Sequence, residues 1–251
     1  MNRNTIVRQS WAIILSLICF SFINPATTLK KINIQGYPQG ATYQQTYYTA
    51  DSMVTQKETD KVLTHLDTSV SLYLPTSSIC KFNRSVRGIY IDLTFQTLVK
   101  NALKINKETY GLIDITLKPL VDTWGFGVKR TGSFPDSKKM KALLNYLGSA
   151  RVWLEGSFLH ILRPGVQFDL IGIAQGYAAD LLARLLEKHH IYNYVTEQGA
   201  ELRIKGNKPN GDPFNIGIEA IDGNDISPLL LRKIIAPGDG AVTTLGNYCK
   251  F

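Results

Sequence analysis

Hydrophobic spacing along the chain predicts a strong helix in its second half. Between Ala174 and Leu186, apolar residues recur at intervals of three and four and so occupy one helical face. Lys188 and two histidines follow, where positive charge suits the end of the helix dipole. Residues 166–169 are predicted to form a short strand that ends in Asp169 and turns at a glycine into this helix. The unpaired N–H groups at such a turn favour a bound anion. Asp169 either caps the helix or holds a ligand, and the local pattern favours the cap.

The same patterns predict three further helices, at residues 55–74, 93–109 and 136–147. Strands are predicted at 29–48 (with breaks at Gly36, Pro38 and Gly40), 89–92, the hairpin 152–162, the pair 194–205, 214–220, 229–235 and 241–251. Since the strands outnumber the helices and are not evenly interleaved with them, we predict an α+β fold with a mostly antiparallel sheet and packed helices. The last predicted strand runs to Phe251 without a following turn, so we expect the C-terminal part of the fold to be missing.

Composition describes an ordinary globular protein with a basic surface. The chain has 251 residues, of which 44% are hydrophobic and 19% charged, and its net charge is +8. Such a charge suits nucleic acid, an anionic membrane or an anionic ligand. The lysines and arginines are scattered, with no run longer than two residues and no nucleic-acid motif. We therefore predict no nucleic-acid partner.

The N-terminus has the pattern of an export signal. Arg3 and Arg8 precede an apolar run at residues 11–23, which is too short to span a bilayer comfortably. We predict that residues 1–28 are a signal peptide or membrane-targeting segment and that residues 29–251 form one domain. Cys19 is a candidate for lipid attachment, although the residues before it fit a lipidation site poorly. Lipid attachment therefore stays open.

An unusual segment at residues 110–127 carries candidate chemistry. Asp114 and Thr116 alternate within an apolar run, and Trp124 and Phe126 lie among glycines. A buried acid needs partners, so Asp114 is either a turn residue or part of a site.

Five segments, in this order, resemble the ApbE family of flavin transferases (FAD:protein FMN transferases). The resemblance covers residues 37–251. The matching segments are 71–83 (SxYxPxSxISxFN in the family), 114–127 (DITxGPLVxxWGFG), 169–180 (DLSGIAKGYAVD), 199–206 (GGExRxxG) and 241–248 (AxATSGxYR).

The resemblance implies an ApbE-like, T-fold-like architecture and a specific reaction. Members of the family bind FAD with Mg²⁺ and transfer FMN to a Ser or Thr hydroxyl of an acceptor flavoprotein, releasing AMP. The acceptor is typically a subunit of a membrane redox complex. Together with the N-terminal signal, this implies an exported protein on the periplasmic side of the inner membrane, with or without a lipid anchor.

The resemblance also implies site residues. The cofactor-binding positions are Gln39, Tyr73, Leu112, Ile113, Asp114, Asp169 and Gln175, and Gly172 matches a metal-contacting backbone position. No catalytic residue is assigned. Tyr73, Leu112 and Ile113 are also compatible with a plain core role.

Several positions depart from the family pattern. Gln39 replaces Met, Ile171 replaces Ser, Gln175 replaces Lys and Lys118 replaces Gly, while Gln198 and Ala200 alter the GGE turn. Loss of the Lys charge near a pyrophosphate is expected to weaken binding or catalysis.

The family's HxIDPxTG segment and its later Asp and Thr metal ligands would fall after Phe251. We therefore expect this chain to be weakly active or inactive. The alternative is a non-catalytic exported flavin-binding protein or a gene remnant. A basic surface-binding module without a ligand ranks third.

Overall fold

The computed structural model describes residues 28–37, 42–51, 53–128, 135–219 and 231–244. Gln39, Cys19 and most of the predicted targeting segment lie outside this part, as does the predicted strand beyond Thr244. No helix in these ranges is both long enough and apolar enough to cross a membrane.

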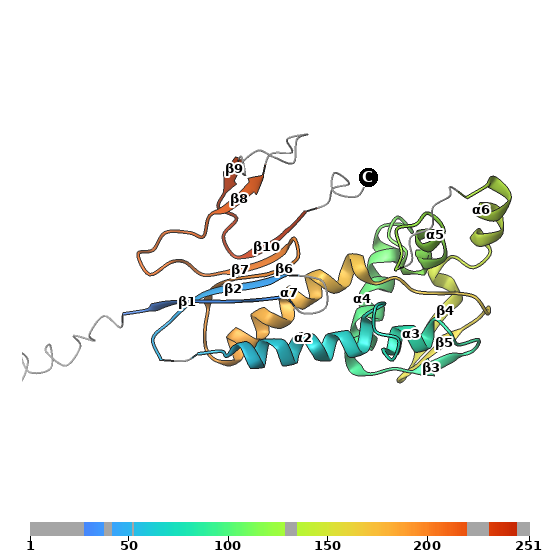
Figure 1. Cartoon of the computed structure of the whole chain (residues 1–251), viewed down its shortest axis with the longest axis horizontal. Helices are drawn as coiled ribbons and strands as arrows, with labels where there is room; N and C mark the ends of the chain where they lie inside the picture. The colour runs from blue at the N-terminus through green and yellow to red at the C-terminus, as the bar shows by residue number, and fades with distance from the viewer. Residues whose placement is uncertain (1–27, 38–41, 52, 129–134, 220–230, 245–251) are drawn as a thin grey trace, which may run out of the picture.

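A five-stranded antiparallel sheet forms one half of the described structure (Figure 1). Its order is β1 (Lys30–Gly36), β2 (Tyr43–Thr49), β6 (Asn193–Gln198), β7 (Glu201–Lys205) and β10 (Gly240–Thr243). The helices α2 (Gln56–Val70) and α7 (Ile171–Lys188) cover one face of this sheet. The hairpin of β8 (Ile216–Glu219) and β9 (Leu231–Ile235) pairs separately. The predicted α+β class and antiparallel pairing are confirmed.

The other half is built from shorter elements around a three-stranded antiparallel sheet of order β3-β5-β4. These strands are β3 (Gly88–Tyr90), β5 (Phe158–Ile161) and β4 (Val152–Glu155). The helices here are α3 (Ser78–Phe82), α4 (Leu93–Glu108), α5 (Lys118–Thr123) and α6 (Ser137–Leu144), with 3-10 turns η1 (Ile115–Leu117) and η2 (Ser149–Arg151).

One continuous hydrophobic core joins the two halves. Phe168, directly before α7, is fully buried and packs 4.4 Å from Phe82, ring centroid to ring centroid. Phe95 of α4 meets both rings edge-on. The start of α7 therefore rests on α3 and α4, while Leu182 and Leu186 further along α7 are also fully buried in the core.

Asp92 fixes the start of α4 against two other helices. Its carboxylate accepts hydrogen bonds from the Phe95 N–H, the Ser69 hydroxyl of α2 and the Ser78 hydroxyl of α3. Burial acts to raise the pKa of Asp92, but these hydrogen bonds to the charged form outweigh it and leave the pKa lowered.

Two predictions about local structure are wrong. The helix predicted to reach residue 74 ends at Val70, because the chain turns extended at Ser71. Residues 166–169 form no strand. Their backbone bonds instead to the Asn83 side chain and the Ile115 carbonyl, so no neighbouring strand takes part.

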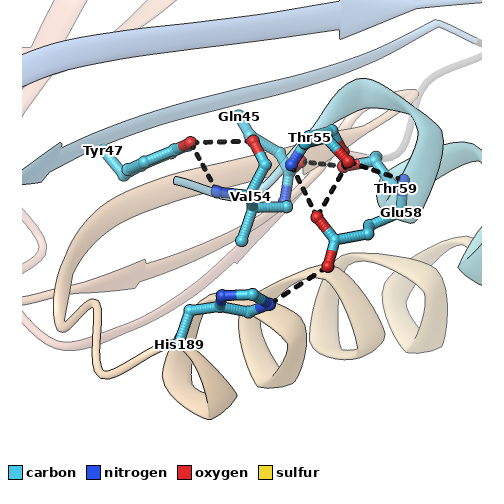
Figure 2. Close-up of polar contacts among 7 residues, drawn as sticks. All are labelled: Gln45, Tyr47, Val54, Thr55, Glu58, Thr59 and His189. Carbon is cyan, nitrogen blue, oxygen red and sulfur yellow. Dashed lines mark hydrogen bonds and ion pairs between the residues drawn. The ribbon is translucent and has the colours of Figure 1, made fainter. Parts of the chain in front are cut away.

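A polar network fixes the N-terminus of α2 (Figure 2). Thr55 and Glu58 form a capping box, in which the Thr55 hydroxyl oxygen accepts from the Glu58 N–H and the Glu58 carboxylate accepts from the Thr55 N–H at 2.9 Å. The same carboxylate lies 3.3 Å from Nε2 of His189 at the end of α7. The hydrogen bond from the Thr55 N–H lowers the pKa of the Glu58 carboxyl most, and the hydrogen bond from the Thr55 side chain lowers it further.

Replacing Thr55 by Ala is expected to lower the free energy of unfolding by about 1 kcal/mol, because the cap of α2 is lost. Urea denaturation followed by circular dichroism measures the change. Thr64→Ala, at an exposed position within the same helix, is the matched control and should leave stability within about 0.5 kcal/mol. Equal losses in the two variants would contradict a capping role for Thr55.

Candidate functional site

Two of the motif segments meet at the start of α7. The Asp169 N–H donates to the Ile115 carbonyl at 2.8 Å. This bond joins the segment that begins at Leu112 to the turn that leads into α7. The site predicted from two separate sequence motifs is therefore one place in the fold.

Asp114 organises the first segment. Its Oδ1 accepts from the Thr116 N–H at 2.8 Å, the Thr116 hydroxyl at 2.7 Å and the Ser149 hydroxyl at 3.0 Å. Its Oδ2 accepts from the Ser149 N–H at 3.2 Å. The carboxylate thus caps η1 and also ties this segment to η2. These hydrogen bonds show the turn role, one of the two roles left open by the sequence, and the role of Asp114 in cofactor binding stays a prediction.

The residues before Asp114 lie on an exposed turn. Leu112 is 87% exposed and Ile113 46% exposed, so neither is a core residue. The turn is fixed by Asn106, whose side chain donates to the Ile113 carbonyl at 2.7 Å. It presents apolar surface to solvent at a defined position.

Asn83 holds the second segment. Its side-chain Nδ2 donates to the Phe168 carbonyl at 2.9 Å, and its Oδ1 accepts from the Phe168 N–H at 2.7 Å. The Gln167 side chain donates to the Asn83 carbonyl at 3.2 Å. This two-point contact sets the backbone immediately before Asp169.

The first turn of α7 is open at its N-terminus. Its N-cap residue, Leu170, supplies no side-chain hydrogen bond. Asp169 accepts from the Ile171 N–H at 2.9 Å, so it serves one N–H of the turn although it is not the cap residue itself. Ile171 and Gly172 are exposed. The Ile173 and Ala174 N–H groups donate to the Leu170 carbonyl, so the Gly172 N–H and the helix dipole are what this turn offers to an anion.

A cavity of about 560 Å³ lies beside these segments. Lys118, Arg84 and Lys139 contribute three cations to its wall, against the single acid Asp122, which is ion-paired with Lys118. Gln167 also lines the cavity, two residues before Asp169. The excess positive charge suits an anionic ligand.

Gln175 lies on the α7 side of this region. A Cβ atom added at Gly199 would lie 3.3 Å from Nε2 of Gln175, so the side chain packs against the β6–β7 turn. Gly199 has φ +64, a conformation suited to glycine, and the close approach gives a second reason for glycine there. Gln175 therefore sits between the helix and the altered GGE turn.

Tyr73 lies in the turn between α2 and α3 and is 64% exposed, so it too is not a core residue. Leu72, its neighbour, lines the cavity. The structure thus brings Asp169, just before α7, to the end of the helix that carries Gly172 and Gln175, and joins Asp169 to Ile115, next to the 112–114 turn. Gln39 lies outside the described residues.

Asn83, Thr116 and Ser149 were not identified as site residues from the sequence. Asn83 lies at the end of the 71–83 family segment, where nothing in the sequence marks it as the partner of Phe168. Ser149 has no local signal, because its partner Asp114 is 35 residues away.

Within the described ranges, no three His, Cys, Asp or Glu side chains converge in a way that would hold a metal ion. The described residues therefore do not by themselves fit a magnesium site. Gly172 could offer only a backbone carbonyl of the α7 first turn.

Comparison with known proteins gives consistent matches. The model of the ApbE family matches residues 39–251. The FAD:protein FMN transferase of Vibrio cholerae is 33% identical over 228 residues, which cover 87% of this chain and 67% of that protein. The Haemophilus influenzae protein of the same name is 32% identical, with 76% of this chain and 59% of that protein covered. The chain therefore spans about two thirds or less of these two relatives.

Solved structures match in the same way. The flavin transferase ApbE from Vibrio cholerae superposes with a TM-score of 0.78 at 31% identity, over 88% of this chain and 72% of that one. The flavinyl transferase ApbE of Pseudomonas stutzeri gives a TM-score of 0.71 at 28% identity, over 76% and 63%. The resemblance inferred from five motifs and the expected fold are confirmed.

Proposed function

The chain belongs to the ApbE family, and from this premise we propose that it transfers FMN from FAD to a Ser or Thr hydroxyl of an acceptor flavoprotein. The observation that carries the proposal is the Asp169–Ile115 hydrogen bond, which joins two family segments at an anion-favouring helix start. In the reaction, the hydroxyl oxygen forms a bond to the phosphorus of the FMN half. The bond to the AMP oxygen breaks, AMP leaves, and the hydroxyl proton is released.

We assign the anionic part of FAD to the start of α7 and the basic wall of the cavity. Lys118, Arg84 and Lys139 would attract the pyrophosphate, and the Gly172 N–H at the start of α7 would orient it. Of these three cations, Lys118 is the least exposed, because only 15% of its side chain is accessible to solvent. It would supply positive charge in a site where Gln175 is neutral.

The rings of FAD need apolar surface. Tyr73, Leu112 and Ile113 are exposed beside the site, and we propose them as ring contacts. Asp114 would position Leu112 and Ile113. Asp169, just before α7, and Gln175, on α7, would contact the nucleotide. Gln39 completes the proposed set.

Magnesium dependence is also proposed, as a property of the family. Because the described residues do not fit a complete metal site, no step is derived through the ion. Activity measured with MgCl₂ and with EDTA tests the dependence directly.

The cellular setting is a proposal as well. Residues 1–28 would export the chain to the periplasmic side of the inner membrane, where a redox-complex subunit would be its acceptor. Fractionation of cells that express the full chain, followed by protease accessibility, tests the location.

Replacing Lys118 by Ala is expected to weaken FAD binding about tenfold, because one charge-assisted contact to phosphate is lost. Titration of FAD, followed by its fluorescence, measures the affinity. Lys104→Ala is the control, because Lys104 also forms an i,i+4 ion pair, with Glu108 on α4, but does not line the cavity. Unchanged FAD affinity in a folded Lys118→Ala protein would remove Lys118 from the site.

The reaction itself is tested by mass. The chain is incubated with FAD, MgCl₂ and an acceptor domain, and the acceptor is then weighed. A gain of one FMN supports transferase activity. FAD binding without a mass gain would instead support the non-catalytic flavin-binding protein, an alternative favoured by the neutral Gln175.

A further inference from the structure

The three-stranded sheet β3-β5-β4 has one face in the core and one face outside (Figure 1). Side chains alternate along a strand, and paired residues share a face. Leu159 of β5 is fully buried, and Ile89 and Leu154, its partners in the sheet, pack against the core. The pairs Tyr90–Phe158 and Trp153–His160 therefore belong to the outer face.

Ring contacts make this outer face one continuous aromatic surface. Tyr90 and Phe158 meet edge-on with centroids 4.9 Å apart, and Phe158 lies 4.5 Å from His160. Trp153 stacks in parallel on His160 at 4.5 Å. We call these four residues the aromatic face. Tyr90 is 77% exposed and Trp153 45% exposed, so this packing leaves much of the surface open to solvent.

Two exposed aliphatic side chains lie next to the ends of these strands. Val86, before β3, is 61% exposed, and Leu162, after β5, is 65% exposed. Exposed apolar surface of this kind marks an interaction site.

The two segments that build this sheet have a strongly basic charge. Residues 81–91 and 148–163 carry five basic residues, namely Lys81, Arg84, Arg87, Arg151 and Arg163, of which Arg84 also lines the cavity described above. They carry one acid, Glu155, whose carboxylate lies 3.1 Å from Nε2 of His160. An occupant with negative charge is therefore favoured.

We propose that the aromatic face is a membrane-docking surface, which binds the headgroup region of an anionic bilayer. Tyr and Trp settle at this depth because each combines an apolar ring with a polar group, and arginines add attraction to anionic lipid. Val86 and Leu162 offer hydrocarbon to the acyl boundary, whereas a nucleic acid would use stacking and hydrogen bonds. The apolar run at residues 11–23, after Arg3 and Arg8, is typical of chains that reach a membrane. The proposal is independent of flavin transfer.

Fluorescence of single tryptophans in the full chain tests the proposal. The chain has three, Trp11, Trp124 and Trp153. Trp11→Phe with Trp124→Phe leaves Trp153 alone, and Trp11→Phe with Trp153→Phe leaves Trp124 as a control of nearly equal exposure, 44% against 45%. Vesicles of phosphatidylglycerol and phosphatidylcholine, containing brominated lipid, quench a tryptophan that enters the bilayer.

Quenching of Trp153 but not of Trp124 is expected, and it should weaken in high salt and on pure phosphatidylcholine. Within the Trp153-only protein, Arg87→Ala should weaken docking about fivefold, the change expected for one basic residue at an anionic surface. Tyr90→Ser should reduce quenching several-fold, whereas Tyr37→Ser, at another exposed tyrosine, should not.

Three results would overturn the proposal. The first is an unquenched Trp153 in protein that sediments with the vesicles. The second is equal quenching of Trp153 and Trp124. The third is a shift of the Trp153 emission in the absence of lipid. A shift with protein concentration would assign the face to a second copy of the chain, and a shift on adding a single-stranded oligonucleotide would assign it to nucleic acid.

Discussion

Replacing Asp114 by Ala is expected to lower the free energy of unfolding by about 3 kcal/mol and to reduce FAD binding strongly. The carboxylate accepts four hydrogen bonds, and all four donors belong to two residues that are nearly or fully buried, Thr116 and Ser149. Removing the carboxylate leaves these donors unpaired, and this desolvation cost exceeds the loss of an ordinary surface contact. Urea denaturation and FAD titration measure the two effects.

Two further substitutions make this prediction specific. Asp114→Asn keeps an oxygen at the Oδ1 position, where three of the donors meet, and should cost less than Asp114→Ala. Asp136→Ala removes an exposed cap with one hydrogen bond, to the Lys139 N–H, and should cost about 1 kcal/mol or less. If Asp114→Ala lost FAD binding at unchanged stability, the carboxylate would be a direct ligand contact instead of an internal brace.

Local pattern was sufficient for much of the secondary structure. The helix predicted at residues 93–109 is α4, because its apolar spacing matches the face that it buries. The hairpins predicted around Gly156 and Gly199 are present, and both glycines have positive φ, as tight turns between antiparallel strands require. These features depend on residues close together in sequence.

The features that could not be predicted depend on distant partners. Residues 166–169 have the composition of a strand, yet their backbone bonds are taken by Asn83, 85 residues away from Phe168. The order β3-β5-β4 places a strand of residues 88–90 beside the later hairpin, which no local pattern indicates. The motif resemblance predicts which segments form the site. Only the structure shows that the Asp114 carboxylate joins two 3-10 turns and that Asp169 lies just before a helix.

The position of Asp169 depends on Asn83. Replacing Asn83 by Ala is expected to lower the free energy of unfolding by about 3 kcal/mol and to abolish tight FAD binding. Its side chain satisfies both the N–H and the carbonyl of Phe168, whose ring is fully buried between Phe82 and Phe95. Without it, two backbone groups next to the core lose their partners, and the turn into α7 is no longer held.

Chemical denaturation and FAD titration of Asn83→Ala test this dependence. Asn101→Ala, on an exposed position of α4, is the matched control and should change stability by less than about 0.5 kcal/mol. Asn83→Asp is the more informative variant, because it keeps the acceptor for the Phe168 N–H but faces the Phe168 carbonyl with a second oxygen. It should therefore be nearly as harmful as Asn83→Ala. Wild-type stability in Asn83→Asp would show that the donor half of the contact contributes nothing, and it would contradict this prediction.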